Sequence, residues 1–474
     1  MSSNVIGEGA YGCIHKPSLK CKDKYIADYK NKVSKLLQKR FADKELSEYS
    51  LVESIDKEHS FYLGNPTECS PEKSKQTEDS IKKCKHSEEL LKEFDDLALL
   101  IMDDGGVNIK DYSDNVTKWK STKENKQKVE VLWLEFYRIV KAIDIFLKKG
   151  VLHLDIKPQN IVLNEETMRL NLIDFGLTAT VEEKMKQSYD SKNQTAIYHW
   201  SYPFEFHFLN RNVYEDFASK TETEKTEYFE TILQNIKEKK KDPDTAAFTH
   251  FFSFISNKDD VNIDFIRNSL NGFYATITQQ IHKQSYKAFI QKSIQSVDLY
   301  GLGITILYMT TRMKHLMDKK LFKQMNDLAY KMIESQLSKR YTIEQVVSEY
   351  ESILTDSGLL VKYNMNIDKN TVKKTVAEPN VIDNQVKPGE QILKEVSQNP
   401  STSTSTSIST SRVTHRPSIN KHLETIHSSD ILVSPNTLSK RATSVNAKRH
   451  VHAKNTEKKK QSKTKKYTIK QNRE

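Results

Sequence analysis

Residues 153–160 read HLDIKPQN, and residues 174–176 read DFG directly after the strand-like segment 170–173. The first segment lies where a helical pattern of apolar residues gives way to a pattern typical of strands. Its polar side chains are therefore expected on a loop. Carboxylate and amide oxygens are the ligands that Mg²⁺ prefers, so the two segments together are candidates for a metal-binding site.

Two helices are predicted on either side of these segments. In residues 129–149, apolar side chains recur at a spacing of three and four, and Lys148 and Lys149 suit the negative end of the helix dipole. Gly150 then provides a helix stop. Residues 296–313 are apolar on nearly all sides, so this second helix should be buried.

A glycine-rich segment, GEGAYG at residues 7–12, lies close to the start of the chain. Glycines let a backbone approach phosphate oxygens and direct N–H groups at them. A plain tight turn is at least as good an interpretation of this motif alone. A dinucleotide-binding fold would need a helix directly after it, but the Lys16–Pro17 pair disfavours that helix. A β-hairpin folded over a ligand fits better.

Taken in order, these motifs resemble those of eukaryotic-type serine/threonine protein kinases over residues 5–356. The resemblance extends to DLYGLG at residues 298–303, whose aspartate in that family caps backbone N–H groups of the catalytic loop. It also includes Arg340, which in the family pairs with a glutamate, here Glu205. More narrowly, GAYGCIHKPSLKC followed by VSKLL is similar to the kinases of large cytoplasmic DNA viruses.

The resemblance implies an α+β, two-lobed protein-kinase fold with a small β-rich N-lobe and a larger helical C-lobe. We expect the N-lobe at residues 1–104, with an insertion at about 64–93 that forms a solvated loop. The C-lobe is expected at residues 105–356, with an insertion at about 206–290 that either selects protein substrates or only packs. Residues 357–474, which include STSTSTSISTS, should form a disordered basic tail.

The family's chemistry is transfer of the ATP γ-phosphoryl group to a Ser or Thr hydroxyl, with ATP and Mg²⁺ as cofactors. By resemblance, Asp155 orients the hydroxyl and accepts its proton, and Lys157 offsets charge on the phosphoryl group. A lysine at this place is typical of serine/threonine kinases. Asn160 and Asp174 would hold the metal ion.

The resemblance also implies a set of nucleotide-binding residues. These are Ile6, Gly7, Glu8, Gly9, Ala10, Tyr11, Gly12, Cys13, Ile14, Val33, Lys35, Glu45, Met102, Asp103 and Val162. Lys35 is preferred over Lys32 as the lysine that anchors ATP, because a small apolar residue stands two positions before it. Its partner is expected on the next helix. Glu45 fits best, since Tyr49 would then point to the core, and Glu48 and Glu53 are alternatives.

Charge and cysteine content give weaker indications. The net charge is +11, but residues 357–474 alone hold 22 Lys and Arg against 9 Asp and Glu. Nucleic acid, an anionic membrane and acidic proteins are the candidate partners of this basic tail, and the protein substrate is unknown.

The four cysteines are too irregularly spaced for a disulfide framework or a zinc site, so we expect free thiols in a reducing, intracellular compartment, the cytoplasm or a virion. The longest apolar run, Leu97–Met102, is too short for a transmembrane segment.

Two other functions remain open from the sequence. The chain could be a pseudokinase-type binding scaffold, although the candidate catalytic and metal-binding residues are all present. It could also be a small-molecule phosphotransferase, a class with a similar catalytic loop. The DLYGLG segment and Arg340 favour protein substrates.

Overall fold

The computed structural model describes most of the first 364 residues. The described ranges are 3–9, 12–189, 199–238, 246–255, 263–280 and 285–364. Ala10 and Tyr11 of the glycine-rich segment lie outside them, as does nearly all of the expected tail. Among the described residues, every helix is either too short or too polar to cross a lipid bilayer.

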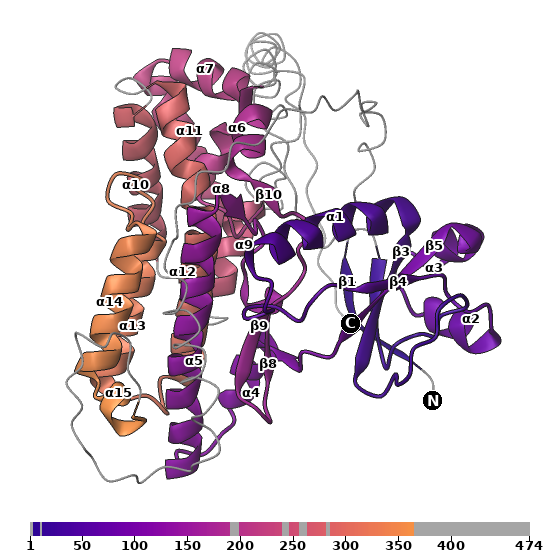
Figure 1. Cartoon of the computed structure of the whole chain (residues 1–474). Helices are drawn as coiled ribbons and strands as arrows, with labels where there is room; N and C mark the ends of the chain where they lie inside the picture. Colours follow the sequence, from indigo (N-terminus) through magenta and orange to yellow (C-terminus); the bar gives the residue numbers. More distant parts are fainter. Residues whose placement is uncertain are drawn as a thin grey trace, which may run out of the picture.

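The N-terminal lobe is built on a five-stranded antiparallel sheet with the order β1-β2-β3-β5-β4. The strands are β1 (Asn4–Gly9), β2 (Gly12–Lys16), β3 (Lys32–Gln38), β4 (Thr67–Cys69) and β5 (Leu97–Asp103). Helix α1 (Lys39–Ile55) follows β3 directly and lies along the sheet (Figure 1). Apolar side chains of β3 and β5, such as Leu36 and Leu99, are fully buried and form the core of the lobe.

The expected solvated loop at residues 64–93 is instead folded and partly buried. Besides β4 it holds helices α2 (Lys75–Ile81) and α3 (Ser87–Lys92). Ile81, Cys84 and Leu90 pack with Cys13 and Leu36 of the sheet in one apolar cluster. The prediction of a solvated loop is therefore wrong, because the apolar residues hidden in this lysine-rich segment cover one face of the sheet.

All four cysteines form disulfides, contrary to the expectation of free thiols. Cys13 is bonded to Cys84 and Cys21 to Cys69. Both bonds tie the region of β2 to the inserted segment, and their partners lie 71 and 48 residues apart in the sequence. Spacing along the chain carries no information about such a pairing, which depends on the folded insertion. The expected reducing compartment loses its support, since disulfides persist mainly in oxidising surroundings.

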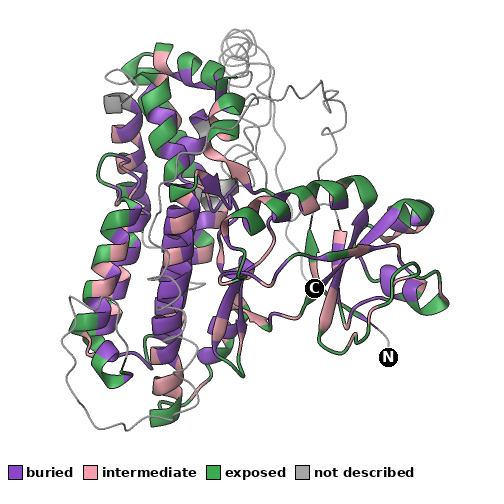
Figure 2. Ribbon diagram, in the orientation of Figure 1, coloured by how far each residue is buried: buried purple, intermediate pink, exposed green. Residues whose placement is uncertain are grey.

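The C-terminal lobe is helical, as expected from the resemblance. Its helices outside the inserted region are α4 (Ile109–Val116), α5 (Lys123–Lys148), α12 (Val297–Met313), α13 (Lys319–Met332), α14 (Ile343–Asp356) and α15 (Leu359–Lys362). The two predicted helices are confirmed as α5 and α12, and Figure 2 shows both as largely buried. Gly150 adopts a positive φ of 71° just past α5. Leu359 and Leu360 are buried, so the folded part extends beyond the expected boundary at residue 356, to Asn364.

Short strands at the junction of the lobes carry the two polar segments. They are β6 (Val107–Asn108), β7 (Val151–Leu152), β8 (Ile161–Asn164), β9 (Arg169–Leu172) and β10 (Ala179–Thr180). HLDIKPQN joins β7 to β8, with a 3₁₀ turn at its end, and DFG follows β9. Antiparallel pairing of β8 with β9 brings the two segments to the same end of a small sheet.

The inserted region before α12 forms part of the main core. After α6 (Val181–Tyr189), it contributes α7 (Arg211–Ser219), α8 (Glu222–Lys237), α9 (Ala246–Ile255), α10 (Ile263–Gln280) and α11 (Tyr286–Gln295). Phe273 of α10 lies 5.3 Å from Phe229 of α8 and 5.8 Å from Phe204, measured between ring centroids. Phe251 of α9 stacks on Tyr300 of α12 at 6.0 Å. These contacts give the insertion a packing role, and a role in substrate selection stays a prediction.

A buried ion pair fixes the inserted region to the rest of the lobe. The guanidinium of Arg340 donates to both carboxylate oxygens of Glu205, at 2.5 and 3.1 Å, and the two side chains are at most 1% exposed. Arg340 also donates to the hydroxyl of Ser296 at the start of α12 and to the backbone oxygen of Glu334. The pairing expected from the resemblance is confirmed, although the motif around Glu205 is altered.

Replacement of Arg340 by Ala should therefore destabilise the fold. Loss of one partner leaves the carboxylate of Glu205 buried without its counter-charge, which costs roughly 3–5 kcal/mol of unfolding free energy. Thermal unfolding should show a clearly lower Tm. The control is Arg211→Ala, which breaks an exposed pair with Glu215 and should leave the Tm nearly unchanged. An unchanged Tm in the Arg340 variant would contradict this account.

Candidate active site

The side chain of Lys35 joins three elements at the junction of the lobes. From β3, its ammonium group lies 3.0 and 2.8 Å from the two carboxylate oxygens of Glu45 on α1. It also lies 3.0 Å from Oδ1 of Asp174, which follows β9. Lys35 and Glu45 are largely buried, with side chains 14% and 7% exposed, whereas the Asp174 side chain is 43% exposed. One carboxylate is thus held inside the lobe, and the other is open to solvent.

The electrostatics of this trio stabilise the charges of Lys35 and Asp174, whereas burial raises the pKa of Glu45. Burial alone would lower the pKa of Lys35, but the carboxylates of Asp174 and Glu45 outweigh burial and raise it above its usual range. The Lys35 ammonium in turn lowers the pKa of Asp174 to about 2, against the opposing effect of burial. Asp174 therefore carries its negative charge at any physiological pH and offers carboxylate oxygens to a cation.

The other lysine and glutamates that the sequence left as alternatives have different partners from Lys35 and Glu45. Lys32 forms an ion pair with Asp103 at 2.5 Å, at the edge of the lobe. Glu48 lies 3.5 Å from Lys44 of its own helix, and Glu53 accepts a hydrogen bond from Asn65. Only the Lys35–Glu45 pair connects β3, α1 and the DFG segment.

The HLDIKPQN loop brings three functional groups together. Oδ1 of Asp155 lies 3.1 Å from the ammonium of Lys157. Its Oδ2 accepts a hydrogen bond from the amide nitrogen of Asn160 at 2.6 Å, and the same nitrogen donates to the Asp155 backbone oxygen. The amide oxygen of Asn160 is then the atom that could face a metal ion. Burial raises the pKa of Asp155, and the charge of Lys157 opposes that rise. A carboxylate with a raised pKa is a better proton acceptor.

Backbone hydrogen bonds hold this loop in place. The carboxylate of Asp298, at the start of α12, accepts from the backbone N–H groups of His153 and Leu154 at 2.7 and 2.8 Å, as the resemblance implied. The backbone N–H of Ile173 donates to the backbone oxygen of Asn160 at 3.0 Å, which places the residue before Asp174 against the loop. The two candidate metal ligands thus come from hydrogen-bonded segments.

A cluster of aromatic rings, packed edge to face or tilted, lies at the site and links the lobes. Phe175 of the DFG segment contacts Tyr49 of α1 at 5.2 Å, Tyr62 at 5.7 Å and His153 at 4.9 Å between ring centroids. The sequence indicated that Tyr49 points to the core, and its hydroxyl also donates to the sulfur of Met102 on β5. Sequence reasoning missed Tyr62, because it lies in an irregular segment with no periodic pattern around it.

The glycine-rich segment forms the hairpin of β1 and β2, as expected. A Cβ at Gly12 would lie 2.1 Å from the backbone oxygen of Leu36 on β3, so only glycine fits there. Two neighbours of the glycines do not face the cleft as expected. Cys13 is buried in its disulfide against the insertion, on the opposite side of β2 from Ile14, and Glu8 accepts a hydrogen bond from the backbone of Lys85. The side chains of both residues are thus engaged by the insertion, and the expected contact of their backbone N–H groups with a nucleotide stays a prediction.

The remaining nucleotide-binding candidates surround the connection between the lobes. Val33 of β3 pairs with Met102 of β5, directly before the connecting residues 103–106. A Cβ at Gly105 would lie 2.4 Å from Cγ2 of Val162, so the connection packs closely on β8. Ile6 of β1 is 56% exposed. The structure places Ile6, Val33, Met102 and Val162 on four different strands that border the interlobe junction.

Sequence reasoning also missed Tyr202, whose hydroxyl donates to the backbone oxygen of Leu154 at 2.6 Å. Leu154 takes a positive φ of 63°. This hydrogen bond ties the segment before Glu205 to the residue next to Asp155. No local sequence pattern distinguishes Tyr202 from the neighbouring aromatic residues.

Comparison with known proteins identifies the family that the chain resembles. Residues 95–200 match the model of the protein kinase domain, a range that holds both polar segments. The chain is 27% identical over 184 residues to serine/threonine-protein kinase ppk31 of Schizosaccharomyces pombe, which covers 37% of this chain and 16% of that protein. It is 39% identical over 61 residues to CBL-interacting serine/threonine-protein kinase 2 of Arabidopsis thaliana, or 13% of each chain.

The chain therefore covers less than a fifth of the length of these relatives. The matched domain and the two lobes show that the chain has a protein-kinase fold, with a β-sheet lobe followed by a helical lobe. The viral likeness seen in the sequence stays a prediction.

Lys35 and Glu45 should act as a unit. In a double-mutant cycle, Lys35→Met and Glu45→Gln should each lower the kcat/KM of the phosphoryl transfer that the resemblance implies by roughly 100-fold, because each variant releases the side chains that the Lys35–Glu45 pair holds in place. The double variant should be little worse than either single variant. The matched control is Lys82→Met, which removes an exposed lysine paired with Asp79. Strictly multiplicative effects would show that the two residues act independently.

Glu48 makes the stability of the protein depend on pH. One of its carboxylate oxygens is buried without a hydrogen-bond partner, and burial raises its pKa from 4.5 to about 7. The folded protein thus keeps a proton that the unfolded chain loses, so the free energy of unfolding falls as the pH rises through this window. Glu48→Gln should reduce the difference in unfolding free energy between pH 5 and pH 8 by roughly 1–2 kcal/mol.

Denaturant unfolding at both pH values measures this effect. Glu53→Gln, a change at an exposed position on the same helix, is the control and should leave the pH dependence as it is. If the Glu48 variant kept the full pH dependence, the buried carboxyl would not be its source.

Proposed function

We propose that this chain is an ATP- and Mg²⁺-dependent serine/threonine protein kinase, similar to those of large cytoplasmic DNA viruses. The proposal rests on two sets of side chains that lie together at the junction of the two lobes. Lys35 lies between Glu45 and Asp174, and Asp155 lies between Lys157 and Asn160. The match of residues 95–200 to the protein kinase domain supports it.

The donor set fits a magnesium ion. Asp174 offers ionised oxygens that remain partly open to solvent, and Asn160 has its amide nitrogen engaged by Asp155, so that its oxygen is available. Mg²⁺ prefers such hard oxygen ligands, one or two from protein and the rest from phosphates and water. When bound with ATP, the ion supplies neutralisation of phosphate charge. In this proposal Asn160 and Asp174 hold it.

The chain's own residues then have distinct tasks. The Lys35 ammonium, fixed by Glu45, offers positive charge to the nucleotide phosphates. Asp155 orients the substrate hydroxyl and accepts its proton, for which its raised pKa suits it. Lys157, next to Asp155, offsets negative charge on the transferred group. Because Asp298 fixes the backbone of this loop, these groups are positioned before substrate binds.

The acceptor substrate and the binding partners are proposed only as chemical classes. We infer that a protein Ser or Thr hydroxyl is the acceptor, since Lys157, Asp298 and Arg340 follow the pattern of protein kinases. The basic segment beyond residue 364 has nucleic acid, anionic membranes and acidic proteins as candidate partners, and it lies outside the described residues.

The test is a phosphoryl-transfer assay with the purified full chain, Mg²⁺ and labelled ATP, comparing a casein-like protein with small alcohols as acceptors. Transfer to Ser and Thr of the protein is the expected result. Transfer only to small alcohols would indicate a small-molecule phosphotransferase. Nucleotide binding without transfer to any acceptor would indicate a binding scaffold. Either result contradicts the proposal.

In the same assay, Asp155→Ala should lower turnover by roughly 10²–10⁴-fold, the usual contribution of a general base. Asp174→Ala should be at least as damaging, because it removes a metal ligand and the counter-charge of Lys35. Asp79→Ala changes an exposed aspartate of the insertion and should leave turnover unchanged. Wild-type turnover in the Asp155 or Asp174 variant would refute the assigned role.

A further inference from the structure

The inserted segment is fastened to the glycine hairpin by three consecutive residues of the turn between α2 and α3. The side chain of Lys83 donates to the backbone oxygen of Ser3 at 2.9 Å, next to the start of β1. The backbone N–H of Lys85 donates to the carboxylate of Glu8, within the glycine motif, at 2.6 Å. Between them, Cys84 forms the disulfide with a residue of β2. The insertion therefore contacts both strands of the hairpin.

The covalent link of this turn lies directly beside the glycine motif. Cys13 follows Gly12, and in the sheet it pairs with Glu8 of β1 and with Leu36 of β3. Its side chain is 1% exposed, and that of Cys84 is 5% exposed. The position of the hairpin relative to the insertion is thus fixed by one buried S–S bond, with weaker hydrogen bonds on either side.

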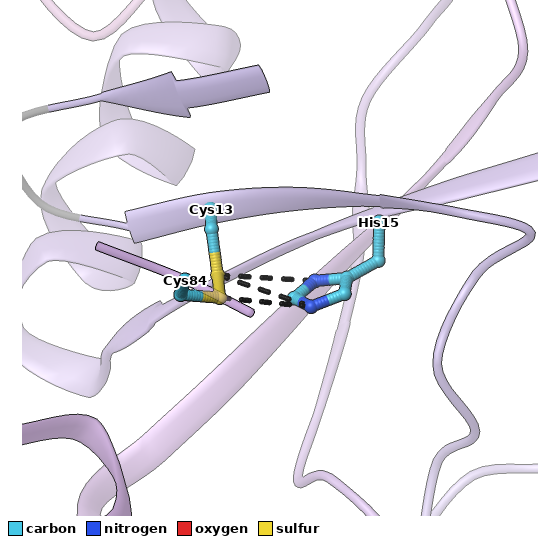
Figure 3. A group of neighbouring side chains, drawn as sticks. All are labelled: Cys13, His15 and Cys84. Atoms are coloured by element: carbon cyan, nitrogen blue, oxygen red, sulfur yellow. Dashed lines mark hydrogen bonds between the residues drawn. A yellow bond between two sulfur atoms is a disulfide. The ribbon is translucent and has the colours of Figure 1, made fainter. Parts of the chain in front are cut away.

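A buried imidazole faces both sulfur atoms. His15 lies two residues after Cys13, on the same face of β2, and is fully buried. Its Nε2 lies 3.7 Å from Sγ of Cys84 and 3.9 Å from Sγ of Cys13 (Figure 3). Burial lowers the pKa of His15, so the imidazole is neutral and carries one N–H. Backbone hydrogen bonds with Ser80 and Cys13 oppose this lowering and hold the ring in place beside the two sulfurs.

A metal centre is the competing interpretation of this cluster. The ligand atoms of Cys13, His15 and Cys84 all lie within 4.8 Å of one another. Thiolate and imidazole are typical zinc ligands, but zinc binds thiolates rather than a disulfide. The two sulfurs are bonded to each other here, so the geometry favours thiol–disulfide chemistry.

We propose that the Cys13–Cys84 disulfide is a thiol-exchange site for a dithiol reductant, and that its opening releases the glycine hairpin and weakens nucleotide binding. The effect on nucleotide binding rests on the proposed function. The release of the hairpin does not depend on that function. The disulfide holds the hairpin over the interlobe junction, so the nucleotide meets a preformed site. Once the bond is open, part of the binding free energy must order the hairpin.

The exchange balances without a further reactant. A thiolate of the reductant attacks Sγ of Cys84, the less deeply buried of the two residues, and forms a mixed disulfide. The Sγ–Sγ bond breaks, and Cys13 leaves as a thiolate beside the imidazole of His15. The second thiolate of the reductant then attacks its own sulfur in the mixed disulfide and releases Cys84. The reductant becomes a cyclic disulfide, and its two protons end on the thiols of Cys13 and Cys84.

The second disulfide supplies the matched control. Cys21 and Cys69 join the segment after β2 to β4, and neither residue belongs to the glycine hairpin. Nucleotide affinity should therefore respond to the first bond and not to the second.

The experiment measures the Kd of Mg²⁺ with a non-hydrolysable ATP analogue by calorimetry, on the full chain, before and after treatment with dithiothreitol. Opening of the bond should raise the Kd by about 5-fold or more, within the usual range of coupling between sites. Re-oxidation should restore the first value. Cys13→Ser with Cys84→Ser should show the weaker binding in both conditions, whereas Cys21→Ser with Cys69→Ser should keep the full response.

Hydrogen exchange of the amides in β1 and β2 gives a readout without nucleotide, and it should become faster in the reduced protein. If no nucleotide binds in any state, the proposed function fails, and hydrogen exchange still decides the inference. Equal exchange of the hairpin in both states would overturn the inference, as would an unchanged Kd. Free thiols at Cys13 and Cys84 in the air-oxidised protein, or one bound zinc per chain, would overturn it as well.

Discussion

The position of the Lys35 ammonium between two carboxylates is the constraint on which the site depends. Glu45 brings α1 against the sheet, and Asp174 brings the DFG segment up from the C-terminal lobe. Each carboxylate stabilises the same cation, so the two lobes are held in one arrangement by electrostatic attraction in a largely buried place. The ring of Phe175 packs on Tyr49 directly beside this trio, and this apolar contact reinforces the arrangement.

Two residues at the candidate site have backbone φ angles that are unfavourable for residues with a side chain. Leu154 and Asp174 have φ values of 63° and 62°, in the left-handed region that side chains usually avoid. Such residues cost roughly 1–3 kcal/mol each and persist only where the surroundings fix them. Asp298 and Tyr202 fix Leu154 by hydrogen bonds, and Lys35 fixes Asp174. Two of the five non-glycine residues that have a positive φ in the described part of the chain therefore lie at the candidate site.

The sequence predicted what short motifs and local periodicity encode. The HLDIKPQN loop, the DFG segment and the helices at 123–148 and 297–313 all lie in such patterns. The pairing of Arg340 with Glu205, 135 residues away, was expected only from the resemblance to protein kinases. The fold of the insertion and both disulfides were not predicted, since they depend on contacts between segments far apart along the chain. Tyr62 was missed for the same reason, because its edge-to-face contact with Phe175 joins residues that are far apart in the sequence.

We expect Asn160 and Asp174 to share one metal–nucleotide site next to Lys35. A crystal structure of the full chain with Mg²⁺ and a non-hydrolysable ATP analogue would decide this. It should show a magnesium ion bound by the amide oxygen of Asn160 and the carboxylate of Asp174, with the nucleotide phosphates facing Lys35. A nucleotide bound elsewhere, or a metal ion that contacts neither side chain, would contradict it.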